Sequence, residues 1–145
     1  MCQELKEQKI KFKENIKLGI MIETPVAAIL SDRLAQEVDF FSIGTNDLTQ
    51  YTIAVDRQNK IMNNICEFSA QHAVLRLIKI IVNNAHKYNI PVKICGDMAN
   101  KEELIPVLAA MNIDELSVAP SRIYKTKKII ISSKIKKFRD YVKNL

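Results

Sequence analysis

Side chains that bind ions or transfer protons follow three short, strand-like runs of the sequence. Glu23 follows the run 18–22, Gly-Thr-Asn-Asp at 44–47 follows the run 40–43, and Cys95-Gly96-Asp97 follows the run 91–94. In parallel α/β proteins, ligands bind at the carboxyl ends of the strands. Three strands that end in carboxylates, an amide and a thiol therefore indicate a candidate ligand site.

Two of these carboxylates have the spacing of a metal site. Glu23 and Asp47 are 24 residues apart, which fits one strand–helix–strand step. If the two strands are neighbours, their backbones lie about 5 Å apart. Two carboxylates on one rim, completed by phosphate and water oxygens, suit octahedral Mg²⁺. The alternative is that each carboxylate caps the helix that follows it, and spacing alone leaves both interpretations open.

Two further residues have both a functional and an ordinary interpretation. Arg57 lies ten residues after Asp47 in a polar stretch, where a guanidinium can bind a phosphate or carboxylate through two hydrogen bonds. The alternative is a solvated loop arginine. Cys95 is either a small buried side chain or a functional thiol at a strand end. Cys2 and Cys66 have no comparable context.

The elements that must position these residues alternate along the chain. Strands separated by helices predict parallel βα units, and four such units are expected. The polar segment 44–69 then follows the carboxyl end of a strand, where ligands bind. Strands are predicted at 18–23, 40–44, 91–95 and 115–119, and helices at 2–14, 25–37, 47–54, 70–88 and 101–111.

Composition excludes several classes of protein. The chain has 145 residues, 48% hydrophobic and 26% charged, which predicts one folded domain. No apolar run approaches the roughly 20 residues that span a bilayer, and the polar start is not a secretory signal. Three widely spaced cysteines without a CxxC pair indicate neither a disulfide framework nor a zinc site. We therefore expect a cytoplasmic protein without a membrane partner.

The positive charge is concentrated at the C-terminus. Residues 121–145 hold nine Lys and Arg against one acid, a balance of +8, whereas residues 1–120 hold 13 against 15, a balance of −2. Ile131, Ile135, Phe138 and Val142 recur at helical spacing, which predicts a docked amphipathic helix with a solvated basic face. Nucleic-acid binding by this tail is the disfavoured alternative, because the tail has no groove-binding motif.

The runs that carry these residues closely resemble phosphoenolpyruvate–protein phosphotransferase, Enzyme I of the bacterial sugar phosphotransferase system. Pyruvate phosphate dikinase and phosphoenolpyruvate synthase share the core Gly-Thr/Ser-Asn-Asp-Leu-Thr-Gln, but Tyr51 and Ala-Val-Asp-Arg at 54–57 are similar to Enzyme I. The resemblance is collinear over nearly the whole chain. It covers 19–28, 37–57, 74–79, 95–99 and 114–121.

The resemblance implies a (β/α)₈ barrel, the TIM fold, whose carboxyl rim binds phosphoenolpyruvate and Mg²⁺. It implies that Glu23 and Asp47 bind the metal. It also implies that Asn46, Asp47 and Arg57 bind the substrate, with Asn46 on the phosphate and Arg57 on the anionic groups. Cys95 matches the cysteine that protonates the enolate carbon as pyruvate forms.

The chain also departs from the family pattern. A (β/α)₈ barrel has about 250 residues, so residues 1–145 are expected to form its C-terminal half, with 121–145 as a basic, helical tail. The first half, and the N-terminal histidine domain that passes phosphate to the phosphocarrier protein, are expected to be missing. The family's Gly-Glu-Met-Ala-Gly is Gly-Asp-Met-Ala-Asn at 96–100, which puts a side chain at Asn100.

The expected family function is phosphoryl transfer from phosphoenolpyruvate to a protein histidine, with this chain inactive alone. The alternative is a non-catalytic binding or assembly module, or half of a split enzyme that pairs with a separate N-terminal half or self-associates. Without a first half, the inward strand faces should lack partners, which predicts a marginal or oligomeric chain. We assign Ile20, Ile22, Phe41, Ile43, Ile94 and Val118 to those faces.

Overall fold

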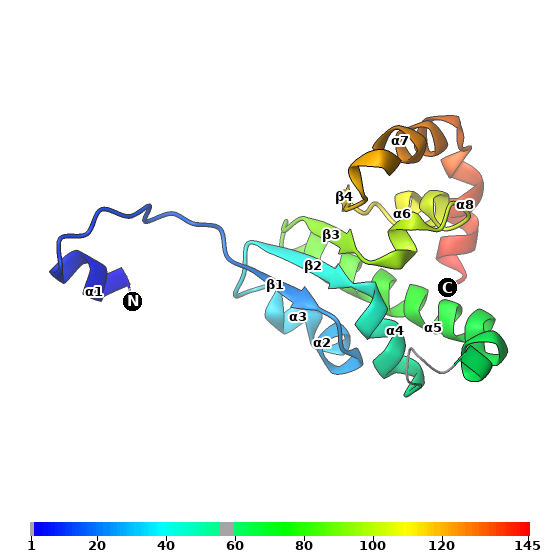
Figure 1. Ribbon diagram of the computed structural model, residues 1–145, viewed down its shortest axis with the longest axis horizontal. Coiled ribbons are helices and arrows are strands. Elements are labelled where there is room, and N and C mark those ends of the chain that lie inside the picture. The colour runs from blue at the N-terminus through cyan, green and yellow to red at the C-terminus, as the bar shows by residue number, and fades with distance from the viewer. Residues whose placement is uncertain (1, 56–59) are drawn as a thin grey trace.

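A four-stranded parallel sheet forms the centre of the molecule (Figure 1). The computed structural model describes residues 2–55 and 60–145, and the side chains of 3–55 and 71–145. The strand order is β1-β2-β3-β4, and each strand pairs in parallel with the next. The prediction of parallel βα units is therefore confirmed. The strands are β1 (Gly19–Ile22), β2 (Phe40–Gly44), β3 (Val92–Cys95) and β4 (Glu115–Leu116).

The helices follow the predicted order, but several boundaries differ from the prediction. The helix expected from residue 70 begins at Lys60, because residues 60–69 contain neither Pro nor Gly to end it. The helix expected over 25–37 is divided at Leu30, where the Ser31 hydroxyl bonds back to the Ala28 carbonyl at 2.8 Å. The helices are α1 (Cys2–Glu7), α2 (Pro25–Ile29), α3 (Ser31–Leu34), α4 (Thr45–Ile53), α5 (Lys60–Lys87), α6 (Ile105–Ala110), α7 (Ile123–Ser132) and α8 (Ile135–Lys143), with short 3₁₀ turns η1 (Asp97–Asn100) and η2 (Pro120–Arg122).

One face of the sheet is apolar and is covered by helices. Ile22, Phe41, Ile43 and Ile94 are fully buried in the core, together with Val74, Leu75, Ile78, Ile81 and Val82 of α5. Ile20 and Val118 are partly buried and pack against the same core. Our assignment of these six residues to an uncovered inward face is therefore wrong. Helices pack on the strongly apolar side of the strands, because covering that side removes more apolar surface from water.

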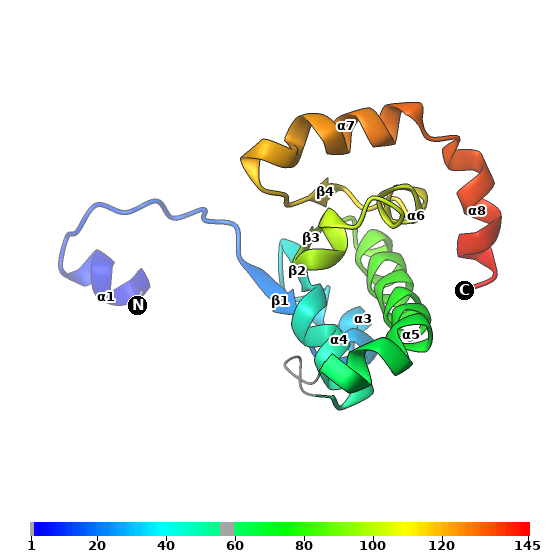
Figure 2. The same ribbon diagram turned by 45° about the vertical axis from the view of Figure 1, so that its right-hand side comes forward.

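The other face of the sheet is mixed and is not covered by a described helix. Figure 2 shows α2, α3 and α5 on one side of β1, β2 and β3, while the segment before β1, with α1, extends away from the body. On the uncovered side, Met21 is 50% exposed. Lys93 Nζ lies 2.9 Å from Glu115 Oε2 and 5.4 Å from the centroid of the Phe40 ring. This face carries charges and can lie against water.

Two aspartates fix the amino ends of the strands in the same way. Asp39 accepts the Leu18 N–H through Oδ2 at 2.7 Å, and its own N–H donates to the Leu18 carbonyl at 2.7 Å. Asp114 repeats this with Val92, at 2.8 Å and 3.1 Å. Each aspartate thus binds both backbone groups of one residue: Leu18, just before β1, or Val92, the first residue of β3. The pairs β1–β2 and β3–β4 are held in register from their first residues.

The basic C-terminal segment forms two helices rather than one. Ile135, Phe138 and Val142 of α8 pack against the core, and α8 lies against α6. Ile131 was predicted on the same face, but it is 84% exposed, because the chain turns between α7 and α8 at Ser133. Within the described residues, no helix is long and apolar enough to cross a membrane.

We expect Asp114 to make the stability of the fold depend on acid pH. Burial alone would raise the pKa of Asp114, but hydrogen bonds from Val92 N–H and His86, with the charge of His86, hold it below its usual value. Because the folded pKa lies below the unfolded value of about 4, the carboxylate stabilises the fold above that pH. The contribution is lost as the pH falls through the folded pKa. Asp114→Asn should therefore lower the melting temperature at neutral pH more than at about pH 3.

The matched control is Asp140→Asn, which changes an exposed carboxylate on α8. It should leave the melting temperature unchanged at both pH values. Equal losses for Asp114→Asn at neutral and acid pH would contradict the role of its charge.

Candidate functional site

The carboxyl ends of three adjacent strands bring the predicted site residues to one end of the sheet. Because β1, β2 and β3 are parallel neighbours, the residues that follow each strand lie at the same end (Figure 1). The register pairs Gly44 with Cys95, which places the ends of β2 and β3 level. We call this set the carboxyl rim: Glu23, Thr45, Asn46, Asp47, Cys95, Gly96 and Asp97.

Glu23 lies directly over the end of β2. A Cβ atom added to Gly44 would meet Glu23 Oε2 at 2.8 Å and Glu23 Cβ at 3.0 Å. Gly44 is the N-cap of α4, and Asp47 lies in the first turn of that helix. The two predicted metal carboxylates therefore project from adjacent strand ends. The structure brings their segments together, as the spacing predicted.

The capping alternative fails for Glu23. Thr24, not Glu23, is the N-cap of α2, and its hydroxyl accepts the Ala27 N–H at 3.3 Å. At α4 the cap is Gly44, which has no side chain. Asp47 is exposed in the first turn, where the helix dipole favours a negative charge. Both carboxylates are thus positioned without serving as an N-cap.

Asn46 is oriented by the loop that follows β3. Its Oδ1 accepts the Asp97 N–H at 2.9 Å, and the Thr45 hydroxyl donates to the Cys95 carbonyl at 3.2 Å. Gly96 has a φ of +113°, and a Cβ atom there would lie 2.5 Å from Thr45 Oγ1. The two loops approach this closely because residue 96 is glycine. With Oδ1 engaged, the Asn46 amide nitrogen is left to donate to a ligand.

The Cys95 thiol lies on the uncovered face of the sheet, beside β2. Its Sγ donates to the Ile43 carbonyl at 3.4 Å and lies 3.5 Å from Ser42 Oγ. Cys95 is half-buried. The side chains of Cys2 and Cys66 are outside the described part of the chain. Cys95 thus lies level with the carboxyl end of β2, and its thiol contacts β2 on the uncovered face.

Basic residues after β4 hold the loop that follows β3. Arg122 NH1 donates to the Asn100 carbonyl at 3.2 Å, and Lys125 forms an ion pair with Glu102. Among the described groups, the buried Oδ1 of Asn100 has no hydrogen-bond partner. The unusual side chain at position 100 is therefore accommodated, but with an unsatisfied polar atom.

Two of our site predictions have a different outcome. Arg57 lies outside the described residues, so its predicted role stays a prediction. Among the described side chains, those of residues 3–55 and 71–145, no group of three or more His, Cys, Asp or Glu gathers as a metal site. Glu23 and Asp47 follow two neighbouring strand ends, and their role as metal ligands stays a prediction.

Sequence reasoning missed Ser42 and Arg122. Side chains along a strand alternate between its two faces, so Ser42 lies on the same face of β2 as Gly44. Because Gly44 pairs with Cys95, this face of β2 lies beside Cys95. That signal was present in the sequence. Arg122 had no such signal, because its contact with Asn100 depends on how two loops fold.

Comparison with known proteins gives a consistent result. A family model described as "PEP-utilising enzyme, PEP-binding domain" matches residues 1–135. Proteins named phosphoenolpyruvate-protein phosphotransferase are similar to the chain. That of Buchnera aphidicola subsp. Schizaphis graminum is 42% identical over 98% of this chain and 25% of its own length. That of Buchnera aphidicola subsp. Baizongia pistaciae is 47% identical over 90% and 23%. That of Listeria monocytogenes is 42% identical over 88% and 22%. The chain therefore spans about a quarter of the length of these relatives.

We expect Gly96→Ala to disrupt the carboxyl rim. The new methyl group would collide with Thr45 Oγ1, and the alanine backbone would have to keep a φ that L-residues rarely adopt. The loop must shift, which should cost about 1–3 kcal/mol and break the bond from Asp97 N–H to Asn46. Urea unfolding measures the loss, and amide hydrogen exchange at Asp97 measures the broken bond. Asn46→Ala is the companion variant, because it should expose the same amide without the collision. Unchanged exchange in Gly96→Ala would contradict this account.

Proposed function

The chain belongs to the family of PEP-utilising enzymes, and we propose that its carboxyl rim transfers the phosphoryl group of phosphoenolpyruvate to a protein. The observation that carries the proposal is the convergence of carboxylates, an amide and a thiol from three strand ends. Its relatives are named for this reaction. Because the chain spans only about a quarter of their length, the activity of a whole relative comes to it as a proposal.

We propose that the sheet is the C-terminal half of a (β/α)₈ barrel, with residues 121–145 as a basic helical extension. All four strands are parallel, and α2, α3 and α5 lie on one side of them, as in the wall of such a barrel. The uncovered face would then be the barrel interior. Phe40, Ser42, Lys93, Cys95 and Glu115 would line it.

The donor chemistry of the rim fits Mg²⁺. Glu23 and Asp47 supply hard carboxylate oxygens from adjacent strand ends, and the metal would take its remaining ligands from phosphate and water. When bound, the ion would neutralise charge on the transferring group and on the enolate oxygen. Asn46 would donate from its amide nitrogen to the phosphate, and Arg57 would bind the anionic groups of the substrate.

Cys95 would complete the reaction as the acid. As the phosphoryl group passes to a histidine of the acceptor protein, the electron pair of its bond to the enol oxygen stays on that oxygen. The enolate then uses the electrons of its carbon–carbon double bond to take the proton from Cys95 Sγ. The oxygen becomes the carbonyl of pyruvate, and a thiolate remains. The Ser42 hydroxyl, 3.5 Å away, can donate to this thiolate until it regains a proton from water.

The second candidate function is a binding module or half of a split enzyme. Within the described sheet, β1 and β4 each pair on one side only, so two rows of backbone groups can pair with further strands. In a relative, these would belong to the preceding part of the same chain. In the proposed system the partners are phosphoenolpyruvate, a phosphocarrier protein of sugar transport, and a complementing N-terminal half or a second copy, in the cytoplasm.

The rim carboxylates are tested by complementation. The chain is mixed with the part of the Listeria monocytogenes relative that precedes the matched region, and phosphate transfer from phosphoenolpyruvate to a phosphocarrier protein is measured. We expect no transfer by either part alone and Mg²⁺-dependent transfer by the mixture. Glu23→Gln and Asp47→Asn should each lower the rate of the mixture by about 100-fold or more, because each removes a metal ligand.

The matched controls are Glu37→Gln and Asp32→Asn, which change carboxylates away from the strand ends. They should transfer at the parental rate. A mixture that assembles in sedimentation but never transfers phosphate would favour the binding module. A chain that is a stable monomer and transfers phosphate alone would overturn the half-barrel proposal.

Cys95→Ala tests the proton step. In the same mixture it should slow pyruvate formation by about 100-fold or more, because general acid catalysis is worth that much. Mg²⁺ dependence should stay at the parental concentration, since no metal ligand changes. The control is Cys66→Ala, expected to be neutral. Parental turnover in Cys95→Ala would exclude the thiol as the proton donor.

A further inference from the structure

The outer side of α7 and the start of α8 form a strongly basic surface. Five lysines here are exposed, and the corner where α7 meets α8 lies at the edge of the molecule (Figure 2). Residues 121–145 carry nine basic side chains against one acid. We call the five exposed lysines the basic ridge: Lys127, Lys128, Lys134, Lys136 and Lys137.

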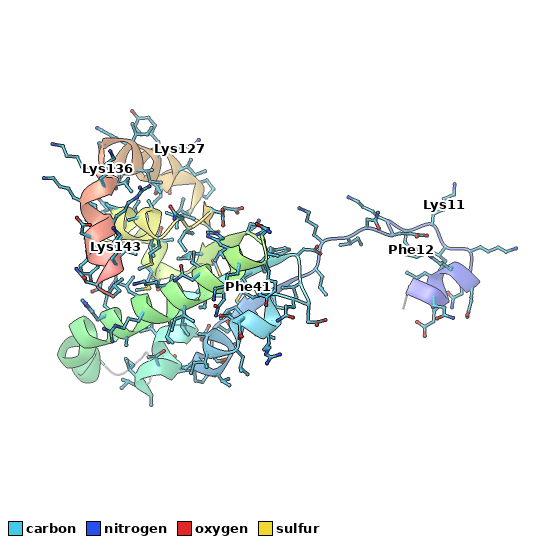
Figure 3. All side chains as sticks on the ribbon, turned by 180° about the vertical axis from the view of Figure 1, so that it is seen from behind. Lys11, Phe12, Phe41, Lys127, Lys136 and Lys143 are labelled. Carbon is cyan, nitrogen blue, oxygen red and sulfur yellow. The ribbon has the colours of Figure 1, made fainter. Side chains whose placement is uncertain are left out.

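The charges of the basic ridge are not neutralised within the described part of the molecule. The ion pairs there involve Lys6, Lys93, Lys125 and His86, and no ridge lysine. Figure 3 shows Lys127 and Lys136 at one end of the molecule and Lys11 at the other. Like charges that gather without partners raise a positive potential, which is relieved by a polyanionic surface.

Exposed apolar side chains lie among these lysines. Ile131 is 84% exposed and Tyr124 is 79% exposed, and both lie on α7. They are seven residues apart, with Lys127 and Lys128 between them, so the four side chains share one side of the helix. The core does not use this side of α7, because the helix turns the buried Thr126 and the half-buried Ile129 and Ile130 inward.

We propose that the basic ridge, with Ile131 and Tyr124, binds the surface of an anionic lipid bilayer. Lysine side chains extend to lipid phosphates while their hydrocarbon stems and the apolar side chains enter the interface. Each lysine near such a surface contributes favourably, and five together suffice for reversible binding. The absence of a bilayer-spanning run led us to expect no membrane partner, but a helix that lies on the surface needs no such run.

A lipid surface fits these residues better than nucleic acid does. Phosphates of either partner would attract the lysines, but only a bilayer offers an apolar phase for an isoleucine that is otherwise held in water. Single-stranded nucleic acid is bound by several aromatic side chains in a row, and the outer side of α7 presents only Tyr124. The inference is independent of the proposed phosphoryl transfer, because it uses no residue of the carboxyl rim.

Vesicle sedimentation tests the proposal on the full chain. We expect the chain to sediment with vesicles of phosphatidylcholine and phosphatidylglycerol, and not with phosphatidylcholine alone. Binding should fall steeply as salt is raised, because the charges are exposed. A ridge variant with four lysines changed to glutamine should bind about tenfold more weakly or worse. Its substitutions are Lys127→Gln, Lys128→Gln, Lys136→Gln and Lys137→Gln.

The control removes the same charge from the opposite end of the molecule. Four of the five lysines of the segment before β1 are changed; all four are exposed, so their loss changes net charge equally without touching the ridge. This variant should bind within about twofold of the parent. Circular dichroism of both variants checks that they are folded. The control substitutions are Lys9→Gln, Lys11→Gln, Lys13→Gln and Lys17→Gln.

Ile131→Ser separates a lipid surface from other polyanions. It should weaken binding to anionic vesicles about threefold or more, since the apolar side chain that would enter the lipid interface is lost. It should not change binding to a single-stranded RNA oligonucleotide. Equal weakening by the ridge and control variants would overturn the proposal, as would no binding to anionic vesicles. RNA binding tighter than vesicle binding, and insensitive to Ile131→Ser, would assign the ridge to nucleic acid instead.

Discussion

Burial of one apolar face of the sheet against α5 is the interaction on which the rest of the structure depends. Ile22, Phe41, Ile43 and Ile94 are fully buried, and each contributes about 1.5–3 kcal/mol of hydrophobic stabilisation. A shift of one residue in any strand would turn these side chains to the other face. Burial therefore sets the register, and the register brings Gly44 level with Cys95. The carboxyl rim exists because this core permits one alignment of the strands.

Hydrogen bonds at the two ends of the sheet complete that alignment. At the amino ends, Asp39 and Asp114 each bind both backbone groups of a residue at the amino end of the preceding strand. At the carboxyl ends, the bonds run between side chains in the first turn of α4 and the backbone at and after the last residue of β3. The amide of Asn46 is thereby held by the protein before any ligand arrives. A site prepared in this way loses little entropy when it binds.

Local sequence patterns predicted the helices, the strands and most of the residues of the carboxyl rim. They did not predict which face of the sheet or of a helix each residue occupies. Alternation of apolar and polar runs predicted four strands and their order, and strand ends revealed Glu23, Asp47 and Cys95. The strands are only two to five residues long, too short for alternation to show which side the helices cover. Ile22 and Phe41 were therefore placed on the wrong face. Helical spacing likewise grouped Ile131 with Phe138, because periodicity does not reveal a turn between two helices.

The polar character of the uncovered face has a consequence for how such a protein is made. In the proposed half-barrel, the two parts of the barrel would be completed at different times, and the part that folds first would be exposed to water until the other is made. If isoleucine and phenylalanine lined the uncovered face, it would associate with other unfolded or partly folded chains during that time. Here the Lys93–Glu115 pair and the Ser42 hydroxyl lie on the uncovered face of the sheet, while the apolar face is already covered by α5. Either part could therefore be made first without exposing an apolar surface, since the uncovered face is one that water already solvates.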